Sequence, residues 1–267
     1  MSRAGDELDA VLLGCVELTS RLRILRLRPA TRAVGAFEPG QFVQIGLPMA
    51  DEGGVVPARP GRVRMHKRPY SIASAPAELP ELELYVALVE GGRFTPLLWR
   101  LGAGDRCWLD PTPKGLFTFS RVPPGADLVL VATGTGLAPY VSLLRRHAAG
   151  GPWRKLVLVH GVRQPEELGY RAELEARAAR DATVRYVPVV SRPEPADAWT
   201  GIAGRVQAAL TGPALGAHGV ELDPARAHVF LCGNPAMIRD VRALLEPRGY
   251  RPDTLEVPGS LHFETYW

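Results

Sequence analysis

Cysteine is scarce in this sequence, and long apolar segments are missing from it. The three cysteines, Cys15, Cys107 and Cys232, lie far apart and form no CxxC pair. So few thiols cannot hold a four-cysteine iron–sulfur cluster or a disulfide scaffold, so we expect reduced thiols, no metal site and a cytoplasmic protein. No run of about 18 apolar residues exists, so no membrane span is expected. The N-terminal "MSRAGDELDA" is acidic and lacks an apolar core, so we expect no secretory signal.

Lysine is also rare, and the basic charge of the chain is almost entirely arginine. Only Lys67, Lys114 and Lys155 are lysines, and the formal net charge is +4. No tight basic cluster with interleaved aromatic residues is present, so we expect no nucleic-acid partner. The modest positive charge is compatible with an acidic partner, either a protein or a phosphate group. At 267 residues with 46% hydrophobic content, the chain can form one large or two ordinary globular domains.

The first half of the chain has the residue pattern of short β-strands. Apolar residues alternate in 82–89 and 41–47, and 21–29 and 105–110 are shorter candidates separated by Gly/Pro-rich turns. Several short strands at this spacing predict a sandwich or a small antiparallel barrel. Residues 48–66 are rich in Gly, Pro and Arg, and we expect a long loop there.

The second half alternates continuous apolar runs with helical patterns. Apolar runs begin near residues 128, 155, 183 and 228, and each is followed by a candidate helix. Such runs are typical of parallel strands covered on both faces, so this half is predicted to be a doubly wound α/β domain. We place the boundary so that the domains span residues 1–122 and 123–267.

Candidate ligand-binding residues follow the predicted parallel strands. The carboxyl ends of parallel strands meet at one edge of a sheet, where ligands bind. Glycines there let the backbone approach a phosphate, and the next helix N-terminus favours negative charge. The full GxGxxG fingerprint is absent, and tight turns alone would also explain the glycines. The residues at these ends are Thr133, Gly134, Thr135, Gly136, Arg163, Ser191, Arg192, Cys232, Gly233 and Asn234.

Arginines at the strand ends favour NADP over NAD. A sheet that binds NAD typically has an acidic residue for the ribose hydroxyls, whereas this chain has Arg163 and Arg192, with Arg205 one short segment further on. Guanidinium groups bind a 2′-phosphate through paired hydrogen bonds. Each arginine alone could equally be a solvated charge in this arginine-rich chain.

A second candidate anion site lies in "GGRFTPLLW" in the first half. Thr95 is expected to cap a helix that begins with Pro96, and Gly91 and Gly92 form the preceding turn. The free backbone N–H groups would then face a pyrophosphate. An ordinary capped helix over a barrel mouth would show the same residues.

The stretch "KRPYSIAS", Lys67–Ser74, places a proline inside a predicted strand, which usually marks an edge or a bulge. An antiparallel barrel with this Arg-x-Tyr-Ser, followed by a parallel domain with GTG and CGNP, resembles the ferredoxin–NADP reductase family. It is most similar to the compact bacterial ferredoxin/flavodoxin reductases. The resemblance covers nearly the whole chain, and the motifs occur in the family's order.

The resemblance implies an FAD site in the barrel. It implies that Arg68 binds the FAD pyrophosphate, that Tyr70 packs on the flavin, and that the Ser71 hydroxyl points at flavin N5. The turn from Gly92 to Thr95 would hold the other phosphate. The remaining FAD contacts that it implies are Pro69, Tyr85, Val86, Ala87, Phe94 and Thr133.

The resemblance also implies roles for the parallel domain and for the ending "SLHFETYW". The NADP pyrophosphate would lie over 133–136 with Cys232 beside the reacting carbon, although a cysteine ending an apolar strand is usually core packing. Tyr266 and Trp267 would cover a ring of FAD, and Glu264 would either relay a proton or be a surface carboxylate. Plant-type members end near a stacked tyrosine, so this tail departs from their pattern.

The implied function is electron transfer by an FAD-dependent reductase. NADPH would give a hydride to flavin N5, and electrons would pass singly to ferredoxin or flavodoxin, which are acidic carriers. We expect a monomer that has no membrane partner. The alternatives are the reductase component of an oxygenase, a free-flavin reductase, and a non-catalytic sensor that binds FAD and NADP.

Overall fold

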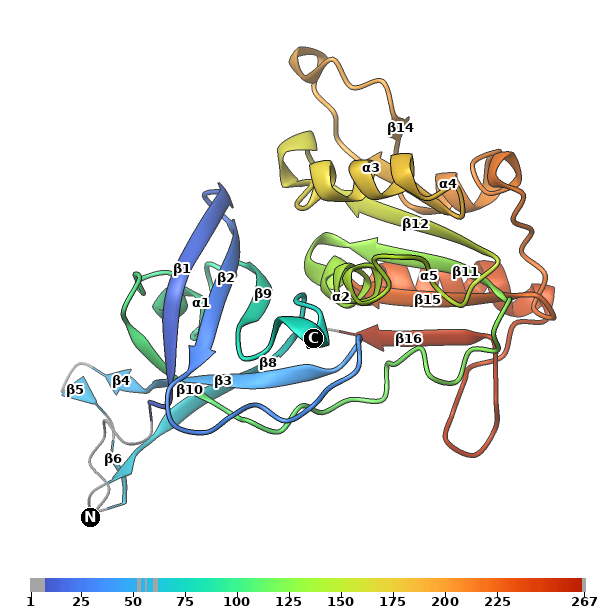
Figure 1. The fold of residues 1–267 in the computed structure, drawn as a ribbon. Coiled ribbons are helices and arrows are strands. Elements are labelled where there is room, and N and C mark those ends of the chain that lie inside the picture. The colour runs from blue at the N-terminus through green and yellow to red at the C-terminus, as the bar shows by residue number, and fades with distance from the viewer. Residues whose placement is uncertain (1–7, 52–53, 56, 60–61, 266–267) are drawn as a thin grey trace. The chain divides into compact units, whose positions relative to one another are not determined.

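The computed structural model describes residues 8–51, 54–55, 57–59 and 62–265. The chain forms two compact units, each built on its own sheet (Figure 1). The first unit comprises Met1–Thr118 together with Val141–Arg146, and the second comprises Phe119–Tyr140 and His147–Trp267. No helix in the described ranges is long and apolar enough to cross a membrane.

The first unit is built on a six-stranded antiparallel sheet with the strand order β8-β3-β10-β1-β2-β9. A bridge between Ile72, just after β8, and Leu84 in β9 joins the two ends of this order and closes the sheet into a barrel. The predicted antiparallel barrel is therefore confirmed. Its strands are β1 (Ala10–Thr19), β2 (Leu22–Pro29), β3 (Phe42–Pro48), β8 (Met65–Ser71), β9 (Leu82–Ala87) and β10 (Arg106–Leu109).

Strand β9 is buried on both faces, although its sequence alternates as a half-exposed strand does. Leu82, Leu84 and Val86 belong to the barrel core, while Glu83 is only 6% exposed. The second half of helix α2 (Ala138–Arg146) lies in the same unit, and its Arg145 Nη1 is 2.9 Å from Glu83 Oε1. An ion pair therefore lets an acidic residue occupy the covered face.

The predicted loop at 48–66 contains short antiparallel strand pairs. Strand β4 (Ala50–Asp51) pairs with β5 (Gly54–Val55), and β6 (Pro57–Arg59) pairs with β7 (Arg62–Val63). These strands are only two or three residues long. Because the stretch is rich in Gly and Pro, which are depleted in strands, its sequence has no strand pattern.

The second unit is built on a six-stranded sheet with the order β14-β13-β12-β11-β15-β16, in which every pair is parallel. The doubly wound α/β prediction is confirmed, and β14 and β16 extend the four predicted strands. The strands are β11 (Asp127–Thr133), β12 (Lys155–Val162), β13 (Val184–Val190), β14 (Ile202–Ala203), β15 (Ala227–Gly233) and β16 (Leu261–Thr265).

The remaining elements are short helices. Besides α2, the α-helices are α1 (Thr95–Leu98), α3 (Arg171–Arg180), α4 (Gln207–Thr211) and α5 (Pro235–Leu245). The 3-10 helices are η2 (Pro76–Glu78), η3 (Gly134–Leu137), η4 (Pro165–Glu167), η5 (Pro195–Asp197), η6 (Gly216–His218) and η7 (Glu246–Arg248).

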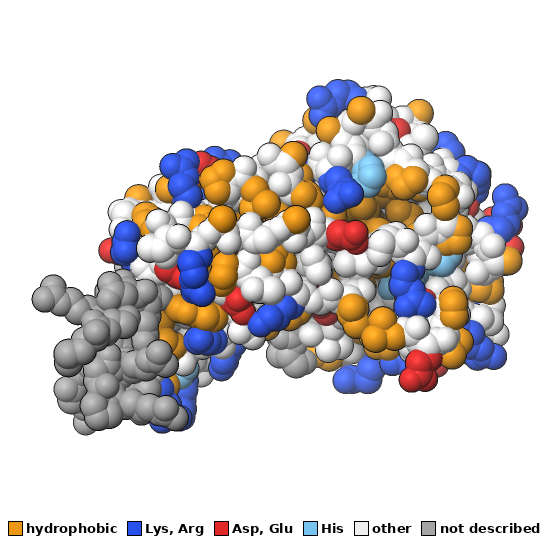
Figure 2. All heavy atoms as spheres, turned by 60° about the horizontal axis from the view of Figure 1, so that its bottom comes forward, with side chains coloured by type: hydrophobic (Ala, Val, Ile, Leu, Met, Phe, Trp, Pro, Cys, Tyr) orange, Lys and Arg blue, Asp and Glu red, His pale blue; other side chains and the backbone are white. Residues whose placement is uncertain are grey.

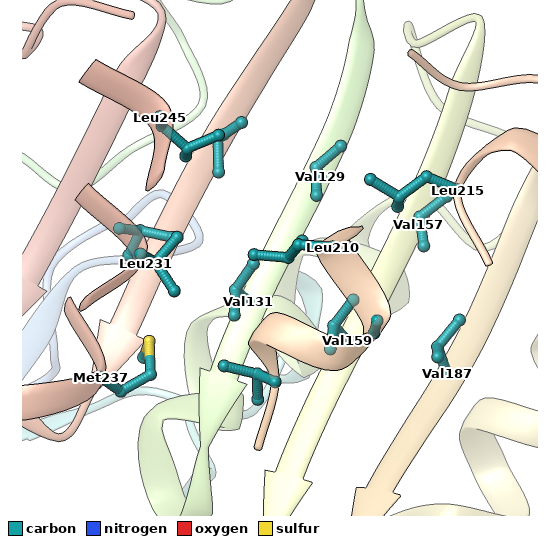
Figure 3. Packing of buried hydrophobic residues seen from close by; sticks show 14 of the residues in the cluster. Val129, Val131, Val157, Val159, Val187, Leu210, Leu215, Leu231, Met237 and Leu245 are labelled. Atoms are coloured by element: carbon teal, nitrogen blue, oxygen red, sulfur yellow. The ribbon is translucent and has the colours of Figure 1, made fainter. Parts of the chain in front are cut away.

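A valine-rich core explains why the parallel strands have continuous apolar sequences. Val129, Val131, Val157 and Val159 have no exposed surface, and they pack with side chains from α4 and α5 (Figure 3). On the other face, the α2 residue Tyr140 is completely buried. Because helices cover both faces, the strands have no solvated side and therefore no alternation of polar residues.

Candidate functional site

The carboxyl ends of β11, β15 and β16 lie next to one another in the parallel sheet. Ala132 pairs with Cys232, and Cys232 pairs with Glu264. The GTG turn after β11 and the CGNP turn at the end of β15 are therefore neighbours, as strand-end reasoning predicts.

The two turns are packed so tightly that a side chain on either of two glycines would collide with backbone. A Cβ atom on Gly136 would lie 2.2 Å from the Cys232 carbonyl oxygen. A Cβ atom on Gly233, whose φ is +128°, would lie 2.7 Å from the Thr133 carbonyl oxygen. These glycines are required for the close approach of one turn to the other.

A hydrogen bond reinforces the same contact. The Asn234 backbone N–H donates to Thr133 Oγ1 at 2.9 Å, so this hydroxyl links the turns. Asn234 Oδ1 accepts from the Ala236 N–H at 2.8 Å and caps α5, with Pro235 as the first helical residue.

A buried tyrosine that the sequence pattern did not single out lies beside Cys232 and Glu264. Tyr140 and Cys232 have no exposed surface, while Glu264 is half-buried. Burial raises the pKa of Tyr140 well above its usual value, and the proximity of Cys232 and Glu264 raises it further. The Tyr140 hydroxyl donates to the Val131 carbonyl at 3.3 Å. Its position in the first turn of the helix after GTG is the sequence signal that could have identified it.

The three predicted arginines follow three adjacent strands, β12, β13 and β14. The Arg192 backbone N–H donates to the Arg163 carbonyl at 2.9 Å, which joins the first two loops. The side chains of Arg163, Arg192 and Arg205 are exposed, and Arg205 makes a 3.4 Å ion pair with Asp240. Such an exposed pair is weak, so it leaves Arg205 available to an anion.

Side chains within these loops fix their backbones. Glu167 accepts from the N–H groups of Arg163 at 2.8 Å and Gln164 at 3.3 Å. Ser191 Oγ donates to the Val162 carbonyl at 3.1 Å, so this hydroxyl holds the loop after β13 against β12.

In the barrel, the Arg-x-Tyr-Ser motif lies on β8, at one end of the sheet order. Pro69 pairs only with Gln44 of β3, and the bridge to β9 begins beyond the strand at Ile72, so on its other side Pro69 has no ladder partner to lose. Arg68 and Pro69 are exposed, Tyr70 is half-buried, and Ser71 is 6% exposed. The Tyr70 ring lies 6.1 Å from the Phe94 ring, and burial raises the pKa of Tyr70 while Arg68 opposes the shift.

The turn before α1 differs from the prediction, because Thr95 does not cap the helix. Thr95 is the first helical residue, and its hydroxyl instead donates to the Val89 carbonyl at 3.2 Å and accepts from the Val89 N–H at 2.9 Å. Gly92 N–H also donates to the Val89 carbonyl at 2.9 Å. The Thr95 hydroxyl therefore holds the two ends of the turn together. It bonds the backbone of Val89, six residues earlier, instead of the N–H groups of its own helix.

The other predicted FAD contacts on β9 differ in how far they are buried. Tyr85 and Val86 are buried in β9, and Ala87 is half-buried at its end. Tyr266 and Trp267 lie outside the described residues. Within the described ranges, no group of His, Cys, Asp or Glu residues could hold a metal ion.

Comparisons with known proteins identify relatives of this chain. The family model of the oxidoreductase NAD-binding domain matches residues 130–243, which include both turns. The chain is 38% identical over 236 residues to ferredoxin–NADP reductase B of Sorangium cellulosum, covering 88% of this chain and 90% of that protein. This chain belongs to the ferredoxin–NADP reductase family. It is also 34% identical to the flavodoxin/ferredoxin–NADP reductase of Escherichia coli, covering 86% of this chain and 88% of that relative.

A solved structure of a family member shares the fold over almost the full length. The ferredoxin NADP+ reductase of Neisseria gonorrhoeae, determined with bound FAD and NADP, aligns with a TM-score of 0.81 and 26% sequence identity. The alignment covers 97% of this chain and 98% of that chain. Both units of the family's fold are therefore present here.

Proposed function

We propose that this protein is an FAD-dependent oxidoreductase that passes electrons between NADPH and a one-electron carrier, ferredoxin or flavodoxin. The observation that carries the proposal is the joined pair of glycine turns at the sheet edge, beside three exposed arginines on consecutive strand ends. Family membership supports the same activity. The Sorangium and Escherichia relatives carry the names of such reductases.

The residues of the barrel fit FAD. Exposed Arg68 offers a guanidinium to a pyrophosphate, and half-buried Tyr70, supported by Phe94, offers an aromatic face to a flavin. The buried Ser71 hydroxyl would approach the flavin edge, and the turn from Gly92 to Thr95 would hold the second phosphate. When bound, FAD accepts electrons in pairs from NADPH and releases them singly. Val86 and Ala87 on β9 and the tail residues Tyr266 and Trp267 remain proposed FAD contacts.

In the parallel unit, we assign the NADP pyrophosphate to the GTG turn and the 2′-phosphate to Arg163, Arg192 and Arg205. Thr133 and Asn234 hold the turns together, so the backbone that faces the pyrophosphate is fixed before binding. Cys232 would lie beside the nicotinamide. Glu264 of β16 is half-buried and pairs with Cys232 of β15, and it is the proposed proton-relay group.

The proposed partner is an acidic electron carrier. On the face shown in Figure 2, Lys and Arg side chains are dispersed among acidic and hydrophobic ones, which suits steering better than binding to a polyanion. The three cysteines are free thiols. We further propose a cytoplasmic monomer whose FAD and NADP domains span residues 1–122 and 123–267.

The experiment that tests the proposed function is an acceptor assay under anaerobic conditions. Purified protein with FAD and NADPH is offered ferredoxin, flavodoxin, or free FMN, and reduction of each is followed by its visible spectrum. The proposal predicts faster reduction of ferredoxin or flavodoxin than of free FMN. Preferred reduction of free FMN would contradict it and favour a free-flavin reductase. If only an oxygenase partner were reduced, the carrier assignment would fail.

A further inference from the structure

A half-buried tryptophan in the connection between β13 and β14 has no role in the function described so far. Residues 191–201 form this connection, which extends beyond the sheet (Figure 1). Trp199 lies near its end, and the indole Nε1–H donates to the Ile202 carbonyl at 3.1 Å. The ring also lies against the backbone of Gly201, where an added Cβ atom would be 2.4 Å from Trp199 Cζ2. Trp199 is therefore held against the first residue of β14.

The same ring reaches the ends of the two neighbouring strands. It packs against a small apolar cluster that consists of Val162 at the end of β12, Leu168 after η4 and Val190 at the end of β13. Val190 has no exposed surface, and Val162 and Leu168 are at most 7% exposed. Because removal of apolar surface from water is favourable, the cluster holds the indole in this position. One side chain thus connects β12, β13 and β14.

On each of these three strands, a residue that Trp199 contacts lies within three residues of an arginine assigned to the 2′-phosphate. The arginines are Arg163 after β12, Arg192 after β13 and Arg205 after β14. Backbone bonds support the same arrangement, since the Gly204 N–H donates to the Val190 carbonyl at 2.8 Å. The tryptophan therefore lies where the three arginine-bearing loops leave the sheet.

The backbone directly before the ring is strained. Ala198 has a φ of +46°, in the left-handed region that residues with a Cβ atom rarely adopt. Such a conformation persists only where the surrounding structure determines it, and it is concentrated at binding and switch sites. Because Ala198 is bonded to Trp199, packing of the indole against the cluster offsets this strain.

We propose that Trp199 is a positioning residue that holds the loops after β12, β13 and β14 at the spacing that one 2′-phosphate requires. Several guanidinium groups bind one phosphate only if they converge on it, and ordering their loops beforehand removes an entropy cost from the binding step. Trp199 thereby sets the preference for NADPH over NADH. This inference rests on the proposed function, because it assumes that the three arginines bind the 2′-phosphate.

The test removes the indole from the FAD-loaded protein in Trp199→Ala. Ordering one flexible side chain costs about 2- to 10-fold in affinity, so releasing two of the arginines should weaken 2′-AMP binding, measured by calorimetric titration, by roughly 10-fold. The ratio of kcat/KM for NADPH to that for NADH should fall by a similar factor. This fall should come from a higher KM for NADPH, while kcat at saturation stays within about 2-fold.

A conservative variant separates the ring from its hydrogen bond. Trp199→Phe keeps an aromatic ring over the cluster and loses the Nε1–H, so 2′-AMP affinity should fall by no more than about 3-fold. If Trp199→Ala does not fold, Trp199→Leu replaces it, because leucine covers the cluster only in part. Its affinity for 2′-AMP should be weaker than that of Trp199→Phe.

Trp153 offers a matched control at the opposite ends of the same strands. It is 7% exposed, and its Nε1–H donates to Thr183 Oγ1 at 3.1 Å, beside the amino-terminal ends of β12 and β13. Trp153→Ala, or Trp153→Phe if the first does not fold, should lower the melting temperature and leave the ratio of NADPH to NADH kcat/KM unchanged.

Three outcomes would overturn the inference. These are wild-type affinity for 2′-AMP in a folded Trp199→Ala variant, equal loss of kcat/KM with NADPH and NADH in that variant, or an equal fall of the coenzyme ratio in the Trp153 control. The proposed function fails separately, if the wild type neither binds NADP+ nor oxidises NADPH.

Discussion

The contact between the two glycine turns gives a prediction whose size follows from the structure. In Gly136→Ala the new Cβ atom would lie 2.2 Å from the Cys232 carbonyl oxygen, 2.5 Å from its carbon and 2.9 Å from Gly233 Cα. All three are backbone atoms, so no side chain can rotate away. Ordinary contact begins at 3.4 Å, so the turns must separate by about 1 Å, and such overpacking typically costs about 1–3 kcal/mol of stability.

Separating the turns should lower kcat/KM for NADPH more than it lowers the stability of the fold. A displacement of about 1 Å in a positioned site can cost about 100-fold in rate, so we expect kcat/KM for NADPH to fall by roughly 10- to 100-fold. The flavin content should stay unchanged, because the proposed FAD contacts lie mainly in the barrel. The assays are NADPH-dependent ferricyanide reduction, calorimetric titration with NADP+, and thermal unfolding.

A matched control separates the turn from general destabilisation. Gly219 has φ +72°, and a Cβ atom added there would meet no atom of the described residues within 4 Å, so Gly219→Ala introduces only left-handed strain of about 1–2 kcal/mol. Its kinetics with NADPH should match those of the wild type. A folded Gly136→Ala variant with wild-type kcat/KM would refute the reasoning, and so would equal kinetic losses in both variants.

Three further predictions concern other parts of the chain. Arg192→Ala should lower kcat/KM for NADPH by about 10- to 100-fold, the value of a charge-assisted hydrogen bond, and change that for NADH by less than about 3-fold. The control is Arg180→Ala, which removes an exposed arginine from α3. Equal loss of kcat/KM with both coenzymes in Arg192→Ala would remove the 2′-phosphate assignment. Thr95→Val should lose both bonds to Val89 and lower the bound FAD, measured as the flavin-to-protein absorbance ratio, whereas Thr95→Ser should retain it. Burial lowers the pKa of His262 to about 4, so the unfolded chain takes up its proton first as pH falls below 6.5. Stability should therefore decline between pH 6.5 and 4, by up to about 3 kcal/mol for this histidine, and urea unfolding should show a shallower decline in His262→Gln. Parallel declines would show that His262 is not responsible.

The carboxyl ends of parallel strands meet at one edge of a sheet, and this rule allowed the main features of the parallel unit to be predicted from sequence. Apolar runs located β11, β12, β13 and β15, and the meeting of GTG with CGNP followed from their shared direction. Pro69 indicated an edge or a bulge, and β8 lies at one end of the sheet order. These features depend on local sequence and on general topology, so no tertiary knowledge was needed.

Other features depend on partners that are distant in sequence. Residues 261–265 form β16 because they pair with β15, and the isolated sequence has no strand pattern strong enough to show this. Thr95 bonds Val89 rather than its own helix, and Glu83 is buried because Arg145 of α2 pairs with it. Propensity and periodicity cannot identify such partners, because they describe only neighbouring residues.

The most direct test of the account is the visible spectrum of the purified protein, recorded anaerobically before and after one equivalent of NADPH. The account predicts bound flavin whose bands bleach promptly on addition. A yellow protein that NADPH leaves unchanged would contradict the reductase function and favour a non-catalytic binding protein. A colourless protein that gains no flavin bands when supplied with FAD would contradict the flavin site itself.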